Sequence, residues 1–570
     1  MPTSALSAPL YPMRRLSLLA VFGLASAVLA WRVLDLQVLD PDFLRKQADV
    51  RHIRTLNLPA NRGTIFDRNG EPLAISTQVR SVSANPRVLS PDHPQLPRLA
   101  SLLDMPLSEV RDLLASKKDK GFIYLARQVS PERAARIDAL DLPGIDFENE
   151  YRRFFPASEI FGHVIGFTNI EDRGQEGVER AFDASLRGVA GERSVVRDGN
   201  RRVIAISREI SQPYPGHDLT LSLDRRLQYL AYQGLAEAVR QNRAKAGSLV
   251  LMDVRNGEVL AMVNQPAYNP NNRGMRTGDR FRNRAITDTF EPGSTIKPFT
   301  IGVALESGRY TPHTPINTGD GWMQVGNKRI RDIGRYGLID VAAVIRKSSN
   351  VGATKIALSL PREDLWGMFH RVGFNQATGA EFPGEALGRL EDVRDWVQIE
   401  HATLAYGYGL SVTPLQLTRA YAAIGAGGVL YPASLLKHDS APAGERVIDK
   451  RIADQLLEMM EGVVGEGGTA PEARVPGYRI AGKTGTVHKA QRGGYAENRY
   501  LSVFAGIAPV SEPRLAMVVL VDEPKGEEHY GGKVAAPVFS KVMEGALRLL
   551  NVAPDDLASL RRDPRPEDFL

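Results

Sequence analysis

Three short motifs follow one another in the chain and could together perform acyl transfer: Ser294-Thr-Ile-Lys297, Ser348-Ser-Asn350 and Lys483-Thr-Gly-Thr486. A serine hydroxyl attacks an amide when a base accepts its proton, and a lysine amine can be that base. Lys297 follows Ser294 by about one helical turn, so both side chains would lie on the same face of a helix. Pro292-Gly293 predicts a loop leading into that helix, whose N-terminal N–H groups would stabilise developing negative charge.

Chance copies show that no motif identifies the nucleophile by itself. A second Ser-x-x-Lys occurs at Ser434-Leu-Leu-Lys437, and a second Ser-x-Asn occurs at Ser83-Ala-Asn85. No Ser-x-Asn lies between Ser434 and the third motif, and Ser83 precedes every candidate nucleophile. Only Ser294 is followed by both other motifs, so we predict that Ser294 is the nucleophile.

The chemistry assigns a role to each remaining residue of the first two motifs. Lys297 can act as a base only when neutral, whereas a free lysine is charged at pH 7. Burial and a second ammonium both lower a lysine pKa, and Lys483 is the candidate for that second charge. The Ser348 hydroxyl can relay protons, and the amide of Asn350 can position both Lys297 and the substrate.

The third motif follows a short apolar run and predicts a strand beside the substrate. Gly485 would allow a ligand to approach the backbone closely. The N–H groups of Thr486 and Ser294 would form an oxyanion hole, and the hydroxyls of Thr484 and Thr486 would orient a substrate carboxylate.

The complete motif set is one known from penicillin-binding proteins and class A β-lactamases. The chain resembles the class B penicillin-binding proteins, which are monofunctional peptidoglycan D,D-transpeptidases, and most of all their cell-division (FtsI) type. The resemblance extends beyond the motifs to residues 62–74, 152–169, 174–180, 408–417 and 530–539.

The resemblance implies a reaction and a set of partners. Ser294 would attack the D-Ala-D-Ala amide of a peptidoglycan stem peptide, and an amine from a neighbouring stem would complete the crosslink during septum formation. β-Lactam antibiotics would acylate the same serine. The expected partners are stem peptides, β-lactams, a membrane glycosyltransferase and other division proteins, with no cofactor.

Several alternative functions remain open. An elongation-type transpeptidase is the nearest one, and a serine β-lactamase or a β-lactam sensor would share the motifs. A mainly structural component of the division complex belongs to a different functional class. Penicillin turnover would indicate a β-lactamase, and function without the serine hydroxyl would indicate a scaffold.

Composition agrees with a multidomain protein that binds neither nucleic acid nor metal. With 570 residues the chain exceeds a single hydrophobic core. A net charge of +6 is a small excess for a nucleic-acid partner. The absence of cysteine excludes thiolate zinc sites, and the ten histidines show no metal-ligand spacing.

The N-terminal region predicts a membrane anchor at residues 16–36. Arg14 and Arg15 precede its apolar stretch, which places residues 1–15 in the cytoplasm. The rest of the chain would lie on the periplasmic side of a bacterial inner membrane. A signal peptide cleaved after Ala25-Ser-Ala27 is the alternative, but the apolar pattern continues beyond that site, which favours an uncleaved anchor.

Residues 40–215 predict a mixed α+β pedestal domain without catalytic groups. Strands are expected at 79–84 and 194–206, helices at 107–116 and 130–140, and turns at 69–70 and 198–199. We expect four charged residues of this domain to form structural salt bridges: Arg62, Asp67, Arg68 and Glu179.

Residues 216–553 predict the transpeptidase domain. Asp224 would cap a helix, and Asn256-Gly257 would join strands at 248–253 and 258–263. Helices are expected at 415–424 and 452–464, and strands at 501–508 and 514–521. This order indicates an α/β sheet covered by helices, and the resemblance implies the serine β-lactamase-like transpeptidase fold with an all-helical subdomain. Residues 554–570 are expected to form a mobile tail.

Overall fold

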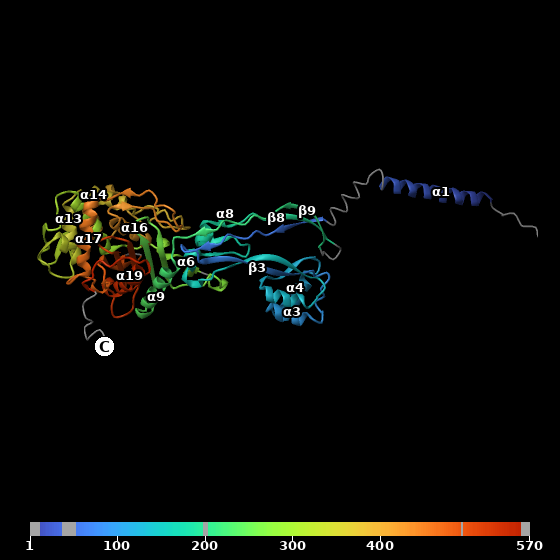
Figure 1. The fold of residues 1–570 in the computed structure, drawn as a ribbon, viewed down its shortest axis with the longest axis horizontal. Coiled ribbons are helices and arrows are strands. Elements are labelled where there is room, and N and C mark those ends of the chain that lie inside the picture. Colours follow the sequence, from blue (N-terminus) through green and yellow to red (C-terminus); the bar gives the residue numbers. More distant parts are fainter. Residues whose placement is uncertain (1–11, 37–52, 198–202, 277, 492–493, 560–570) are drawn as a thin grey trace, which may run out of the picture. The chain divides into compact units, whose positions relative to one another are not determined.

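The computed structural model describes residues 12–36, 53–197, 203–276, 278–491 and 494–559 (Figure 1). They fall into two compact units. The smaller unit comprises the described parts of 1–61, 79–150 and 188–215, and the larger unit comprises 62–78, 151–187 and the described residues from 216 onward. This division differs from a single boundary after residue 215, because two segments of the expected pedestal pack with the catalytic segment.

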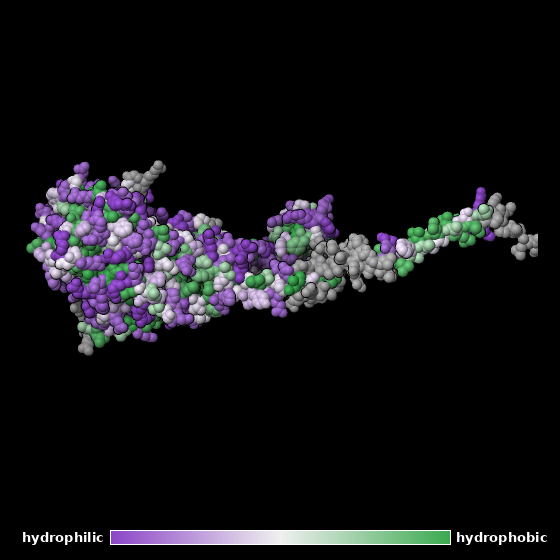
Figure 2. Space-filling view, turned by 90° about the horizontal axis from the view of Figure 1, so that it is seen from above, coloured by the Kyte–Doolittle hydropathy of each residue, from purple (hydrophilic) through white to green (hydrophobic). Residues whose placement is uncertain are grey.

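The predicted N-terminal apolar helix is present as α1 (Pro12–Leu34). Its residues Met13–Leu34 are the one span among the described helices that is long and apolar enough to cross a membrane, and none of this span is buried. Hydrophobic surface follows the length of this helix in Figure 2. A helix of 23 residues is about 35 Å long, which matches the hydrocarbon thickness of a bilayer.

The smaller unit contains an antiparallel three-stranded sheet in the order β1 (Ile53–Leu58), β8 (Gly191–Arg197) and β9 (Val203–Ser211). A second layer packs helices α3 (Leu96–Leu103), α4 (Leu107–Ser116) and α5 (Pro131–Asp138) around a separate apolar core. The strands of that layer are β4 (Ile123–Val129) and the parts of β3 (Pro72–Ala84) and β5 (Ile145–Phe154) that belong to this unit. The predicted strand at 79–84 and the predicted helices at 107–116 and 130–140 are therefore confirmed. The run expected as one strand at 194–206 falls on two strands, β8 and β9, and residues 198–202 between them, with the expected turn at 198–199, lie outside the described residues.

The larger unit is built on a five-stranded antiparallel sheet. Its order is β12 (Val259–Gln265), β11 (Ala246–Asp253), β21 (Leu515–Asp522), β20 (Gly494–Ala508) and β19 (Ala481–Gln491). The predicted hairpin between β11 and β12 is confirmed, with Gly257 in the left-handed region at φ +77°. The strands β11, β12 and β21 are buried along almost their whole length, as expected where a sheet is covered on both sides.

Helices cover the two faces of this sheet. A Cβ on Gly506 would meet Phe539 of α19 (Ala536–Leu549), whereas the next residue, Ile507, lies near Gly425 at the end of α16 (Pro414–Gly425). Successive residues of a strand point to opposite faces, so α19 and α16 lie on opposite sides. The helix α9 (Arg225–Gln241), capped by Asp224 as predicted, packs against α19, and α17 (Lys450–Val464) packs against β19.

A subdomain inserted between β12 and β19 carries the first two motifs. Its helices are η5 (Gly293–Ile296), α11 (Lys297–Glu306), α12 (Val341–Arg346), α13 (Asn350–Leu358), α14 (Arg362–Arg371) and α15 (Gln398–Leu404). This subdomain is not all-helical as expected. Four short strands between α11 and α12 form two ladders: β13 (Pro315–Asn317) with β16 (Leu338–Asp340), and β14 (Trp322–Val325) with β15 (Lys328–Arg331). Glycines at turn positions separate these strands and prevent a continuous helix there.

Short elements complete the larger unit. They are β2 (Ile65–Phe66), η2 (Ser158–Ile160), α6 (Gly162–Ile165), β6 (Phe167–Thr168), β7 (Gly174–Glu176), α7 (Gly177–Ala181), α8 (Asp183–Leu186), β10 (Leu219–Thr220), η3 (Arg273–Met275), η4 (Gly278–Phe281), α10 (Arg284–Thr287), η6 (Val393–Asp395), β17 (Val429–Leu430), β18 (Glu445–Arg446), η7 (Pro471–Ala473) and α18 (Gly531–Val534).

The predicted structural charges occupy the larger unit. Glu179 accepts from the guanidinium groups of Arg62 and Arg153, each through Nε at 2.6 Å, and all three side chains are buried. Arg68 pairs with Glu258 at 3.1 Å. Asp67 instead accepts from the backbone N–H of Arg225, so its carboxylate serves the start of α9 rather than an ion pair.

The first part of the expected mobile tail is docked on the larger unit. The Asp555 carboxylate accepts from the backbone N–H groups of Arg479 and Ser511, at 2.7 and 3.1 Å. The Ser559 hydroxyl accepts from the N–H of Gly477 at 2.8 Å. The remaining tail, residues 560–570, lies outside the described residues.

Candidate active site

Ser294 lies in η5, which leads directly into α11, as the sequence predicts. Gly293 before it has φ +52°, and a Cβ there would lie 2.4 Å from Cγ2 of Val487 in β19. Its N–H donates to the carbonyl of Gly407 at 3.0 Å. Glycine is therefore required at position 293 both by the backbone angle and by the close packing of the nucleophile segment on the sheet.

Lys297 is the centre of the predicted cluster. Its buried Nζ lies 3.1 Å from the Ser294 hydroxyl, 2.7 Å from the Ser348 carbonyl and 2.8 Å from Oδ1 of Asn350. The last two oxygens only accept hydrogen bonds, so they use both N–H bonds of a neutral amine. The remaining lone pair is then left for a hydroxyl proton, as a base toward Ser294 requires.

The environment favours that neutral amine. Burial, and then the charge of Lys483, hold the pKa of Lys297 well below its ordinary value, while Asp332 opposes this shift. Burial also lowers the pKa of Lys483 to about 7. Two fully buried amines in one cluster therefore disfavour full protonation at neutral pH.

Ser348 connects the two lysines. Its hydroxyl lies 3.2 Å from Nζ of Lys297 and 2.9 Å from Nζ of Lys483. Ser348 stands between α12 and α13 with φ +58°, a left-handed conformation that costs a non-glycine residue about 1 kcal/mol or more. This conformation turns its carbonyl and its hydroxyl toward the same lysine.

Asp332 is a residue of the site that the motifs do not reveal. Its carboxylate accepts from the N–H of Asn350 at 2.5 Å, the N–H of Val351 at 2.9 Å and the hydroxyl of Ser349 at 2.6 Å. It thereby caps the N-terminus of α13 and fixes the second motif. It belongs to no motif, and only the fold brings it to position 350, so one sequence offers no signal for it.

The predicted strand of the third motif is β19, the edge strand of the sheet. Lys483 is fully buried on it. A Cβ on Gly485 would lie 3.1 Å from Cγ2 of Thr295 and 3.2 Å from the carbonyl oxygen of Pro292. A small residue is needed here because the nucleophile segment packs against position 485. The sequence had suggested a different reason, the close approach of a ligand.

The two threonines of the third motif occupy different surroundings. The Thr484 hydroxyl is buried, lies 2.9 Å from that of Thr469 and is 3.4 Å from Nζ of Lys483. Thr486 is half-buried, and its hydroxyl accepts from the N–H of Gly531 at 3.0 Å. Thr469 is a further neighbour that the motifs do not reveal.

The chance copies make no comparable cluster. Ser434 hydrogen-bonds to the backbone of Leu436, and Nζ of Lys437 donates to the carbonyl of Arg68. Ser83 donates to the carbonyl of Asp146. The order of the motifs therefore separates the clustered residues from the accidental ones.

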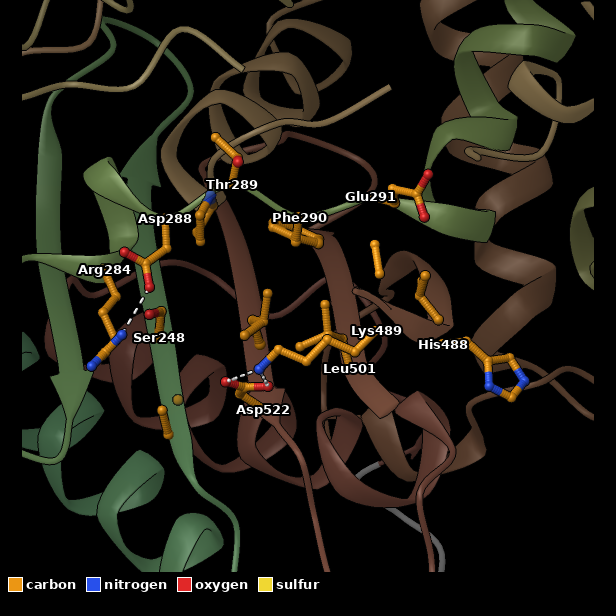
Figure 3. A pocket seen from close by; sticks show the side chains of 16 residues that line it. Ser248, Arg284, Asp288, Thr289, Phe290, Glu291, His488, Lys489, Leu501 and Asp522 are labelled. Atoms are coloured by element: carbon orange, nitrogen blue, oxygen red, sulfur yellow. Dashed lines mark hydrogen bonds and ion pairs between the residues drawn. The ribbon is translucent and has the colours of Figure 1, made fainter. Parts of the chain in front are cut away.

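Two cavities are lined by segments that carry or neighbour the motifs. The larger one, of about 780 Å³, includes Asn350 in its lining together with Tyr406, Tyr408 and Tyr495. The smaller one, of about 170 Å³, lies between the segment before Ser294 and the sheet and is shown in Figure 3. Two pairs of its charged groups are ion pairs, Arg284 with Asp288 and Lys489 with Asp522. The larger cavity is the candidate substrate cleft, because a residue of the cluster, Asn350, lines it.

Comparison with known families agrees with this geometry. The family model described as the penicillin-binding protein transpeptidase domain matches residues 247–544, which contain the whole cluster. The chain belongs to this family. A second model, the penicillin-binding protein dimerisation domain, matches residues 57–221.

Full-length members of the family are similar throughout. The chain is 43% identical over 542 residues to the peptidoglycan D,D-transpeptidase FtsI of Escherichia coli K12, covering 94% of this chain and 92% of that protein. It is 40% identical to the probable peptidoglycan D,D-transpeptidase PbpC of Pseudomonas aeruginosa, covering 95% and 96%. The resemblance to FtsI-type class B penicillin-binding proteins is therefore confirmed.

Solved structures confirm the predicted fold. The transpeptidase domain of penicillin-binding protein 3 from Burkholderia pseudomallei is 44% identical and superposes with a TM-score of 0.55, covering 59% of this chain and 97% of that one. A peptidoglycan synthetase from Bifidobacterium adolescentis shares the fold over 90% of this chain and 98% of its own, with a TM-score of 0.71 and 24% identity.

Proposed function

We propose that this protein is a serine D,D-transpeptidase that crosslinks peptidoglycan stem peptides during septum formation. The observation that carries the proposal is the contact of Ser294 with Lys297, a buried amine whose pKa is lowered by burial and by Lys483. The substrate and the septal role follow from the names of the FtsI relatives.

Acylation begins when Lys297 accepts the hydroxyl proton of Ser294. The Ser294 Oγ then bonds to the carbonyl carbon between the two D-Ala residues, and the N–H groups of Ser294 and Thr486 stabilise the oxyanion. When the C–N bond breaks, the proton passes from Lys297 through the Ser348 hydroxyl to the leaving amine. The products are an ester on Ser294 and free D-Ala.

The second half of the reaction reverses these proton transfers. An amine of a neighbouring stem peptide attacks the ester carbonyl and gives a proton to Lys297, which returns it to the oxygen of Ser294. Water in place of the amine gives carboxypeptidase activity. A β-lactam forms the same ester but keeps its leaving group attached through its ring.

Binding of the terminal carboxylate falls mainly to Thr486 in this proposal. Its hydroxyl is half-buried, whereas that of Thr484 is turned toward Thr469. Thr484 then holds Lys483 beside Ser348, and Gly485 lets this strand approach the nucleophile segment. Asn350 positions Lys297 and the substrate amide.

We further propose that α1 anchors the protein in the bacterial inner membrane. Arg14 and Arg15 at its start place that end in the cytoplasm and the catalytic unit on the periplasmic side. Residues 40–215 would supply non-catalytic surface for a membrane glycosyltransferase and other division proteins. Depletion in the host should give filaments, whereas rounded cells would indicate the elongation role.

A fluorescent penicillin tests the nucleophile. The Ser294→Ala variant should lose covalent label, and Ser434→Ala, at the other Ser-x-x-Lys, should keep it. Label retained by Ser294→Ala would refute the assignment. Rapid release of hydrolysed penicillin by the unmodified protein would instead favour a β-lactamase.

A further inference from the structure

The candidate substrate cleft has an uneven distribution of charge. The strand β15 contributes Lys328, Arg329 and Arg331 to its lining. The tyrosines already described and two acidic residues, Glu400 and Glu497, come from other segments. One element of the cleft is therefore cationic, and it lies in the same cavity as Asn350.

These three cations are exposed, and no acidic side chain neutralises them among the described residues. Among the described residues, no side-chain ion pair or hydrogen bond is made by Lys328, Arg329 or Arg331. The Arg329 guanidinium lies over the ring of Trp322, 4.3 Å from its centroid. Stacking fixes the direction of the guanidinium and leaves its N–H groups free for an anion. By contrast, Lys489 in the neighbouring cavity is held by Asp522 and Glu523.

The cationic strand is attached firmly to the catalytic cluster. The carbonyl of Arg331 accepts from Nδ2 of Asn350 at 3.0 Å, and the next residue is Asp332, which caps α13. Ile330 between the two arginines is buried in a small core with Val351 of the same helix. The position of the charges is therefore set by the same contacts that set the second motif.

We propose, on the basis of the transpeptidase function, that Lys328, Arg329 and Arg331 bind a carboxylate of the stem peptide other than its C-terminal one. The C-terminal carboxylate of the donor is assigned to Thr486, so a second carboxylate, on a side chain or branch of the peptide, meets β15. Cations without a competing carboxylate on a fixed strand attract such a group, and the stacking of Arg329 on Trp322 reduces the side-chain freedom that this residue loses on binding. The cleft then favours stem peptides with a free carboxylate over amidated ones.

Matched substrates test this selection. Two donor peptides ending in D-Ala-D-Ala would differ only in one internal carboxyl, free or converted to a carboxamide, and two acceptor peptides would differ in the same way. Transfer rates with the full-length protein give KM for each form. A lower KM for the free-carboxylate form in the donor pair or in the acceptor pair identifies which of the two stem peptides contacts β15.

The triple variant Lys328→Gln, Arg329→Gln, Arg331→Gln should raise KM for the free-carboxylate form by about 5- to 20-fold, since each exposed ion pair contributes little alone. Neither KM for the amidated form nor kcat should change, and added salt should reproduce the loss. Arg335→Gln is the matched control, because Arg335 is an exposed cation nearby that does not line the cleft.

Equal KM for free and amidated forms in both pairs would overturn the proposal, as would a triple variant that loses both forms equally. Failure of the transpeptidase function itself has another signature. The unmodified protein would then take up penicillin label but transfer none of the four peptides, and the assignment of β15 would fall with it.

Discussion

Replacement of Lys483 by methionine tests how the cluster keeps Lys297 neutral. The two distances through the Ser348 hydroxyl, 3.2 and 2.9 Å, place the two amine nitrogens no more than about 6 Å apart. At an effective dielectric constant of about 20, two positive charges at this separation repel by about 3 kcal/mol. Lys483→Met removes this repulsion, so the pKa of Lys297 should rise toward its ordinary value.

The assay is the second-order rate of labelling by fluorescent penicillin, measured from pH 5 to pH 10. Because the neutral form of Lys297 reacts, the acidic limb of the profile should move to higher pH in Lys483→Met. Because the pKa of Lys483 is about 7, its amine is charged in only about half of the molecules at pH 7. The rate at pH 7 should therefore fall by less than the limit of about 100-fold that corresponds to about 3 kcal/mol, and raising the pH should restore part of it. A rate that falls equally at every pH would refute the reasoning and leave Lys483 with a role in binding alone.

Three further predictions concern the supports of the cluster. Asp332→Asn removes a charge that raises the pKa of Lys297. The acidic limb of the labelling profile should therefore move to lower pH, opposite to the shift expected for Lys483→Met. A shift to higher pH in Asp332→Asn would contradict this reasoning. Gly485→Ala places a methyl group 3.1 Å from Thr295 and should slow penicillin labelling about tenfold. An unchanged rate would show that the nucleophile segment can move to accommodate the methyl group without loss of reactivity. Glu179→Ala removes the carboxylate shared by two buried guanidinium groups, which leaves Arg62 with Asp183 alone and takes away the ion pair of Arg153. It should destabilise the larger unit by about 3 to 5 kcal/mol in denaturant unfolding, whereas a purely exposed pair would change stability by less than about 1 kcal/mol.

Local signals in the sequence were sufficient for most secondary structure. Asp224 and the Asn256-Gly257 turn marked a helix start and a hairpin, because capping and turn chemistry act over a few residues. The four strands between α11 and α12 were missed, since each is only three or four residues long and carries little periodicity.

The site was predictable only where the residues of a motif lie close together in the chain. Ser294, Lys297, Ser348, Asn350 and Lys483 do meet in one cluster, as the order of motifs implied. Contacts made by tertiary packing were not accessible in the same way. Asp332, which caps the second motif, and Thr469, which contacts the third, come from segments outside the motifs. The atoms that leave no room for a side chain at position 485 also come from a distant segment of the chain.

Burial of the catalytic amines also couples folding to proton release. In the unfolded chain the Lys483 amine titrates near 10.5, whereas in the folded protein its pKa is about 7. The unfolded state therefore binds more protons between these values, so stability rises with pH across this window and carries a cost of about 5 kcal/mol below it. The cluster that activates Ser294 opposes folding at neutral pH, and the large core of the catalytic unit must offset it. Catalytic competence and thermodynamic stability are thus opposed at a single side chain.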